Sequence, residues 1–135
     1  MNEIVDEIQG YITQECKVLG NDPKKIFLSG FSQGGFVALY TSQILKETIG
    51  GVITIGAFRS RVCKDFPERK EPVPITMIHG LTDDVIQWDL VKVAFQDLLE
   101  KPYVKKYLIK EMKHDLNNPE ARKIMYQFLR HQNNM

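Results

Sequence analysis

Apolar residues recur at intervals of three or four along several parts of the chain, with charged and polar residues between them. This spacing places apolar side chains on one face of a helix and predicts amphipathic helices. The predicted helices span residues 4–19, 34–45, 86–98 and 118–129. Asn118 and Pro119 strengthen the last of these, because asparagine is a favoured helix N-cap and proline suits the first helical turn.

Short apolar runs rich in β-branched residues lie between the predicted helices, and such runs favour buried strands. The runs are residues 26–28, 51–55, 74–78 and 103–109. A charged segment, residues 58–72, is expected to form a loop. Helices that alternate with strands predict an α/β fold, with a parallel sheet of about four strands and helices on both faces. The chain has 135 residues and no linker-like composition, so we expect one domain over residues 1–135.

The charge balance and the cysteine content narrow the class of protein. The formal net charge is +1, which gives no reason to expect nucleic acid as a partner. Cys16 and Cys63 are too few for a disulfide framework in a chain of this length, which fits a reducing compartment. The first residues lack the basic start and apolar run of a secretory signal, and no stretch is long and apolar enough to cross a bilayer. We therefore expect a cytoplasmic protein without a transmembrane segment.

Gly30, Ser32 and Gly34 fit the G-x-S-x-G pattern of a nucleophile elbow. The motif follows the predicted strand 26–28 and opens the predicted helix 34–45, which is the strand-turn-helix setting that an elbow requires. We expect glycine at both flanking positions because a side chain two residues from the serine would collide with neighbouring backbone. The serine itself is expected to hold a strained conformation that exposes its hydroxyl. The pattern therefore predicts Ser32 as the nucleophile of a serine hydrolase.

A serine hydroxyl needs a neighbouring base to take its proton, and the chain has three histidines. In an α/β-hydrolase the acid and then the histidine follow the serine along the chain. His79 lies within the end of a predicted strand, and His131 lies near the far end of the last predicted helix. His114 follows the fourth predicted strand, at the edge of the sheet where Ser32 also lies. His114 is therefore the predicted base.

The acid that orients this histidine is expected at the carboxyl end of a strand between the serine and the histidine. Residues 79–84 (HGLTDD) form such a strand exit, and both Asp83 and Asp84 qualify by position. Asp89 and Asp97 lie on the following predicted helix, where exposure to solvent is the better interpretation. The spacing alone leaves the choice between Asp83 and Asp84 open.

Two stretches of the sequence resemble the phospholipase/carboxylesterase family, which includes acyl-protein thioesterases and lysophospholipases. The stretches are residues 25–35 (KIFLSGFSQGG) and residues 79–83 (HGLTD). The resemblance implies Asp83 as the acid, because in that family the acid is the fifth residue of an H-G-x-x-D stretch. It also implies His114 as the base, because the family histidine precedes the last helix.

The same resemblance implies the chemistry. Ser32 is expected to form an acyl-enzyme from an ester or thioester, without a metal or organic cofactor. The backbone N–H of Gln33 is expected to donate to the oxyanion. A lipid-modified protein or a lysophospholipid would be a substrate of this class.

Members of the family usually begin with several strands before the first helix of this chain, and one of those strands neighbours the nucleophile strand. A loop of H-G-x-G type follows them and supplies the second oxyanion donor; losing such a donor costs about 10²–10³ in turnover. We therefore expect the chain to be the C-terminal portion of the full fold, with residues 26–28 as an unpaired sheet edge through which it self-associates. The competing hypothesis is a natural short form, a truncated and catalytically impaired paralogue that acts as a binding or dimerisation module.

Overall fold

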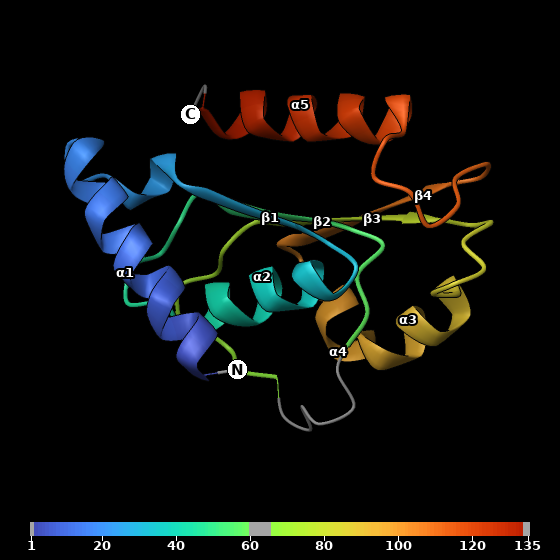
Figure 1. The fold of residues 1–135 in the computed structure, drawn as a ribbon, viewed down its shortest axis with the longest axis horizontal. Coiled ribbons are helices and arrows are strands. Elements are labelled where there is room, and N and C mark those ends of the chain that lie inside the picture. The colour runs from blue at the N-terminus through green and yellow to red at the C-terminus, as the bar shows by residue number, and fades with distance from the viewer. Residues whose placement is uncertain (1, 60–65, 134–135) are drawn as a thin grey trace.

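The computed structural model describes residues 2–59 and 66–133 of the chain. Helices and strands are interspersed along these residues in the order that the sequence predicts, except that two short helices stand where it predicts one (Figure 1). In chain order the elements are α1 (Asn2–Val18), the 3-10 helix η1 (Pro23–Lys25), β1 (Phe27–Phe31), α2 (Gln33–Ile44), β2 (Gly51–Ile55), β3 (Ile75–Gly80), α3 (Trp88–Ala94), α4 (Gln96–Leu99), β4 (Val104–Ile109) and α5 (Pro119–Asn133). Cys63 and the central part of the expected 58–72 loop lie outside the described residues. Within the two described segments, no helix combines the length and the apolar character needed to cross a membrane.

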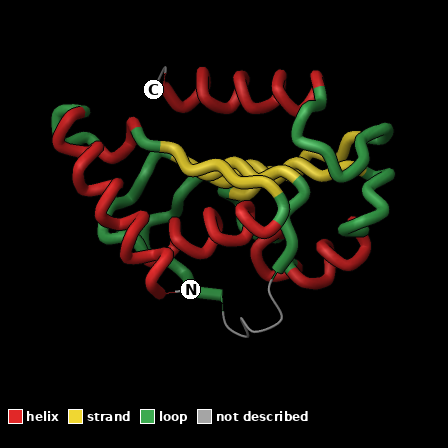
Figure 2. Tube along the Cα trace, viewed as in Figure 1, coloured by secondary structure: helices red, strands yellow, loops and turns green. Residues whose placement is uncertain are grey.

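The four described strands form one parallel sheet in the order β1-β2-β3-β4, which Figure 2 shows nearly edge-on. Each strand pairs with the next one along the chain, so that Leu28 lies beside Val52, Val52 beside Ile75, and Ile75 beside Val104. Because the strands are parallel, their carboxyl ends meet at the same edge of the sheet. The α/β fold with a parallel sheet, expected from the sequence, is confirmed.

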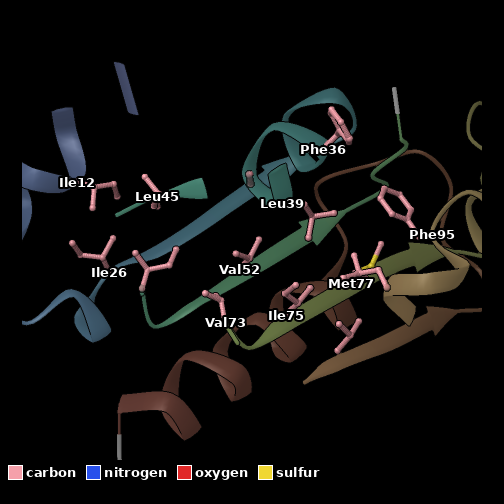
Figure 3. Packing of buried hydrophobic residues seen from close by; sticks show 14 of the residues in the cluster. Ile12, Ile26, Phe36, Leu39, Leu45, Val52, Val73, Ile75, Met77 and Phe95 are labelled. Atoms are coloured by element: carbon pink, nitrogen blue, oxygen red, sulfur yellow. The ribbon is translucent and has the colours of Figure 1, made fainter. Parts of the chain in front are cut away.

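Helices cover both faces of this sheet. α5 lies on one face, whereas α2, α3 and α4 lie on the other, and α1 packs on that same side at the β1 end (Figure 1). Figure 3 shows the larger core, in which side chains of α1, α2 and the sheet gather in one layer. This core includes Ile12, Leu39, Val52, Ile75, Met77 and Phe95. A smaller cluster contains Ile53, Ile55, Ile78, Ile109, Met112 and Ala121, with α5 packed against it. Val52 and Ile53 enter different clusters because successive side chains of a strand point to opposite faces.

Residues close in sequence define the C-terminal end of α1 and the N-terminal end of α5. α1 stops shortly before Gly20 and Asn21, whose φ angles of 72° and 61° are left-handed, and residues in this conformation commonly end helices. The Asn118 side chain accepts a hydrogen bond from the Ala121 backbone N–H at 3.1 Å. The cap predicted for the last helix is therefore confirmed.

The helix predicted over residues 86–98 is wrong in its extent. The structure has two shorter helices, α3 and α4, joined at Phe95, whose φ of −109° and ψ of 22° depart from helical geometry. Leu90 and Val93 are 69% and 70% exposed, whereas Val91 and Phe95 are buried. Val91 and Phe95 are also four residues apart, so the sequence contains two overlapping apolar stripes. Packing against the sheet selects the stripe that includes Phe95.

β1 and β4 are the edge strands of the sheet. The outer side of β1 pairs with no other strand in the described part of the chain, as expected for residues 26–28. β4 buries Val104 and Ile109 and leaves the residues between them exposed. An edge strand has backbone N–H and C=O groups free to pair with another chain.

Candidate active site

Ser32 lies directly after β1, where the chain turns sharply into α2. Its φ of 56° and ψ of −120° form a conformation that residues with a side chain rarely adopt. The turn is held on both sides: the Ser32 N–H donates to Ile55 O at 2.9 Å, and the Gly35 N–H donates to Ser32 O at 3.0 Å. The strained serine backbone that the motif predicts is therefore present.

The glycines around Ser32 differ in the space that is available for a side chain. A Cβ on Gly30 would lie 2.1 Å from the Gly34 carbonyl oxygen, so no side chain fits there. A Cβ on Gly34 would meet nothing within 4 Å outside its own helical turn, so the collision predicted for this position is wrong. Gly34 is exposed on the first turn of α2, whereas the buried Gly35 faces the sheet. A Cβ on Gly35 would lie 2.7 Å from the Ala57 Cβ, which makes Gly35 the second glycine that the turn requires.

We expect Gly30→Ala to lower the free energy of unfolding by roughly 3 kcal/mol, because the added methyl group overlaps backbone that cannot move without opening the turn. Gly34→Ala is the matched control. It is expected to raise the free energy of unfolding by about 0.5–1 kcal/mol, since alanine favours the helix over glycine. Urea denaturation of both variants measures the difference. Equal losses in the two variants would contradict the close approach at Gly30.

His114 lies in the loop between β4 and α5, and its Nε2 atom is 3.0 Å from Ser32 Oγ. The imidazole packs against the Phe31 ring, with centroids 4.7 Å apart and planes tilted by 35°. Gly56 lies beside the ring as well, because a Cβ there would be 3.1 Å from His114 Nδ1. Phe31 is the last residue of β1 and Gly56 directly follows β2, so the sheet itself positions the imidazole. The sequence pattern does not predict this packing.

Asp83 lies in the loop after β3 and is 4% exposed. Its Oδ2 atom is 2.8 Å from His114 Nδ1. Its Oδ1 atom accepts hydrogen bonds from the backbone N–H groups of Val85 at 3.0 Å and Ile86 at 2.8 Å. Asp84 is exposed. Of the two acids that the spacing left open, Asp83 is the one in contact with His114, as the family resemblance implies.

The loops that carry Asp83 and His114 are joined to each other. Thr82 donates to Met112 O through its backbone N–H at 3.2 Å and through its hydroxyl at 2.9 Å. Gly80 permits this approach, because a Cβ there would lie 1.9 Å from Met112 O. The two hydrogen bonds and the glycine fix the loops of Asp83 and His114 relative to one another.

His114 is the histidine that contacts Ser32 Oγ within the described residues, and the other two occupy different positions in the fold. His131 is on α5 and lines a recess beside Pro74 and Ile75 at the start of β3, the opposite end of the sheet from Ser32. His79 is on β3 and is 2% exposed. Burial lowers the pKa of His79 below its ordinary value, and the nearby His114 lowers it further, whereas the hydrogen bond to Ile86 and the charge of Asp83 act in the opposite direction.

Gln33 is the first residue of α2. The first N–H groups of a helix have no intrahelical acceptor, so this amide is available to a ligand near Ser32. In residues 2–59 and 66–133, no group of three or more histidine, cysteine or acidic side chains is arranged to hold a metal ion.

The parallel sheet, the strained serine after β1 and the Ser32–His114–Asp83 cluster at the carboxyl ends of the strands define the class: the chain has an α/β-hydrolase fold. Residues 1–133 match the family model described as Phospholipase/Carboxylesterase. The chain belongs to this family.

Two curated relatives and one solved structure illustrate the similarity. Acyl-protein thioesterase 1 homolog 2 of Dictyostelium discoideum is 38% identical over 101 residues, which cover 73% of this chain and 42% of the relative. Carboxylesterase SOBER1 of Arabidopsis thaliana is 30% identical over 101 residues, which cover 73% of this chain and 44% of the relative. The crystal structure of SOBER1 shares the fold with a TM-score of 0.77 at 24% identity, over 96% of this chain and 63% of that chain. The matched part of the chain thus spans less than half the length of each of these two curated relatives.

Proposed function

We propose that the chain hydrolyses carboxylic esters or thioesters through Ser32, His114 and Asp83. The observation that carries this proposal is a continuous line of contacts: Ser32 Oγ lies 3.0 Å from His114 Nε2, and His114 Nδ1 lies 2.8 Å from Asp83 Oδ2. A carboxylate can only accept, so His114 Nδ1 carries the proton and Nε2 presents its lone pair to the serine hydroxyl. This is the tautomer that a general base requires.

The reaction has two steps. Ser32 Oγ attacks the carbonyl carbon while His114 Nε2 takes the hydroxyl proton, and Asp83 stabilises the resulting imidazolium. The tetrahedral intermediate expels the alcohol or thiol, which receives the proton from His114 and leaves the acyl group on Ser32. A water molecule then attacks the acyl-enzyme, again with His114 as base, and releases the carboxylic acid and free Ser32.

The oxyanion of each tetrahedral intermediate is assigned to the Gln33 backbone N–H. This amide follows the nucleophile directly and belongs to the N-terminus of α2, where the helix dipole favours negative charge. Gly30 and Gly35 support the assignment indirectly, because they let the turn place Ser32 and Gln33 at the end of the sheet.

The substrate is proposed to be an acyl ester or thioester, with an acylated protein or a lysophospholipid as the leading candidates. The names of the relatives, acyl-protein thioesterase and carboxylesterase, support this class. We further propose that residues 1–135 form one α/β-hydrolase domain that corresponds to the C-terminal portion of the full fold. A cytoplasmic location stays a prediction.

A second candidate function is binding or dimerisation through the outer edge of β1. The observation that favours it is that this edge is unpaired within the described residues. Phe27, Leu28 and Phe31 on this strand are half-buried, so a partner strand would bury further apolar surface there. Pairing of two copies at β1 would leave Ser32 at the end of each sheet.

Reaction of the folded chain with a fluorophosphonate probe, followed by peptide mass mapping, tests the proposed hydrolase. We expect one probe per chain, attached to Ser32, and no reaction after heat denaturation. A folded chain that stays unlabelled would contradict the hydrolase. Light scattering of the same sample tests the second candidate function. If two copies pair at β1, the measured mass should be twice the 15.6 kDa of one chain.

A further inference from the structure

His79 is a buried histidine that the proposed mechanism does not use. Its side chain is 3% exposed, and its Nε2 atom lies 2.6 Å from the backbone oxygen of Ile86. Because a carbonyl oxygen can only accept, His79 Nε2 carries a proton and donates it. The imidazole also packs against Trp88, with ring centroids 5.5 Å apart. These contacts join the end of β3 to the loop that precedes α3 and to the first residue of α3.

Ile86, the residue that accepts the hydrogen bond from His79, also donates a hydrogen bond to Asp83. The Ile86 N–H donates to Asp83 Oδ1 at 2.8 Å, and the Val85 N–H donates to the same oxygen at 3.0 Å. The Asp83 side chain is 1% exposed, so water does not set its orientation. One carboxylate oxygen is therefore tied to the 85–86 backbone, and the other is left to face His114.

We propose that His79 is a positioning residue for the catalytic acid: by anchoring Ile86 it fixes the backbone amides that orient Asp83 toward His114. This inference rests on the proposed function, since it assigns Asp83 the role of the acid. It also explains the first two residues of the H-G-x-x-D stretch. The histidine fixes the backbone at the end of the loop, and the glycine leaves space for Met112 O at the start of the loop.

The geometry also keeps His79 from competing for the acid. His79 Nε2 lies 3.6 Å from Asp83 Oδ2, too far for a hydrogen bond, whereas His114 Nδ1 lies 2.8 Å from the same oxygen. Burial lowers the pKa of His79, which keeps the ring neutral and leaves the negative charge of Asp83 to His114. A charged group also lies beside Trp88: Lys106 Nζ is 5.9 Å from the centroid of the Trp88 ring.

The test uses the full chain with ¹⁵N-labelled histidines, in which the His114 Nδ1 proton that Asp83 accepts is observed as a downfield resonance. His79→Phe keeps an aromatic ring beside Trp88 and removes the donor to Ile86. We expect this variant to lose the resonance and to react with the fluorophosphonate about 10²-fold more slowly, since a small displacement of a catalytic group costs about that much. His79→Gln is expected to keep the resonance and most of the rate, because its amide N–H can donate to the same carbonyl.

If His79 had a purely structural role, replacing it would lower the melting temperature but would keep the resonance and the reaction rate. Ile12→Ala, which removes a buried side chain of α1, is the control that is expected to behave in this way. The inference is overturned if His79→Phe, or His79→Leu where the phenylalanine variant does not fold, retains both signals. It is also overturned if His79→Gln loses them to the same degree. If the wild-type chain shows the resonance and His79→Phe loses it, but Ser32 is never labelled, the proposed function fails and the orientation of Asp83 by His79 stands.

Discussion

Replacing Ser32 by alanine is expected to lower kcat for a model ester such as p-nitrophenyl butyrate by on the order of 10⁶-fold. The substitution removes only Oγ, which is the atom that forms the acyl bond in the proposed mechanism and that lies 3.0 Å from His114 Nε2. The backbone of the turn should persist, because it is held by the hydrogen bonds from Ser32 N–H to Ile55 O and from Gly35 N–H to Ser32 O. Steady-state hydrolysis and an unchanged circular dichroism spectrum together separate loss of the nucleophile from loss of the fold.

The size of the loss in combined variants tests whether Ser32 and His114 act as one unit. His114→Ala and the double variant are each expected to fall within about tenfold of Ser32→Ala, because the members of a triad contribute non-additively. Ser29→Ala, which changes an exposed serine three residues earlier on β1, is the matched control and should keep wild-type activity. Hydrolysis that survives Ser32→Ala undiminished would refute the mechanism.

The fold was predictable where local patterns and tertiary packing agree. The strand-helix alternation led to a parallel sheet, and Asn118 caps α5 where the sequence placed a helix start. Prediction failed over residues 86–98, because two apolar stripes overlap there. Leu90 and Val91 are equally apolar, and only contact with the sheet decides that Val91 is buried and Leu90 exposed.

The candidate site was predictable for a related reason. Parallel strands bring their carboxyl ends together, so a serine, an acid and a histidine that follow three different strands converge without any knowledge of side-chain contacts. Contacts between loops carry no such signal. The close approach of Gly35 to Ala57 depends on how α2 lies on the sheet, which the G-x-S-x-G spacing does not define. The bond between His79 and Ile86 likewise depends on a loop path that a single sequence does not reveal.

Asp83→Asn is expected to lower kcat by roughly 10⁴-fold while leaving the chain folded. The asparagine oxygen can still accept from the backbone N–H groups of Val85 and Ile86, as Asp83 Oδ1 does at 3.0 and 2.8 Å. Its NH₂ group then faces His114 Nδ1, which must become the acceptor. The imidazole proton moves to Nε2, so the nitrogen beside Ser32 Oγ has no lone pair for the serine proton.

Asp84→Asn is the matched control for this substitution, because it removes the same charge one residue further along the chain. Asp84 is exposed, and substitution of an exposed charge away from such contacts has little effect. The kcat of the Asp84→Asn variant is therefore expected to stay within about twofold of the wild type. The ratio of the two kcat values therefore measures the hydrogen bond from His114 Nδ1 to Asp83 Oδ2 rather than the net charge of the loop. A larger loss in Asp84→Asn than in Asp83→Asn would assign the acid to Asp84 and would require the loop after β3 to adopt a different path during the reaction.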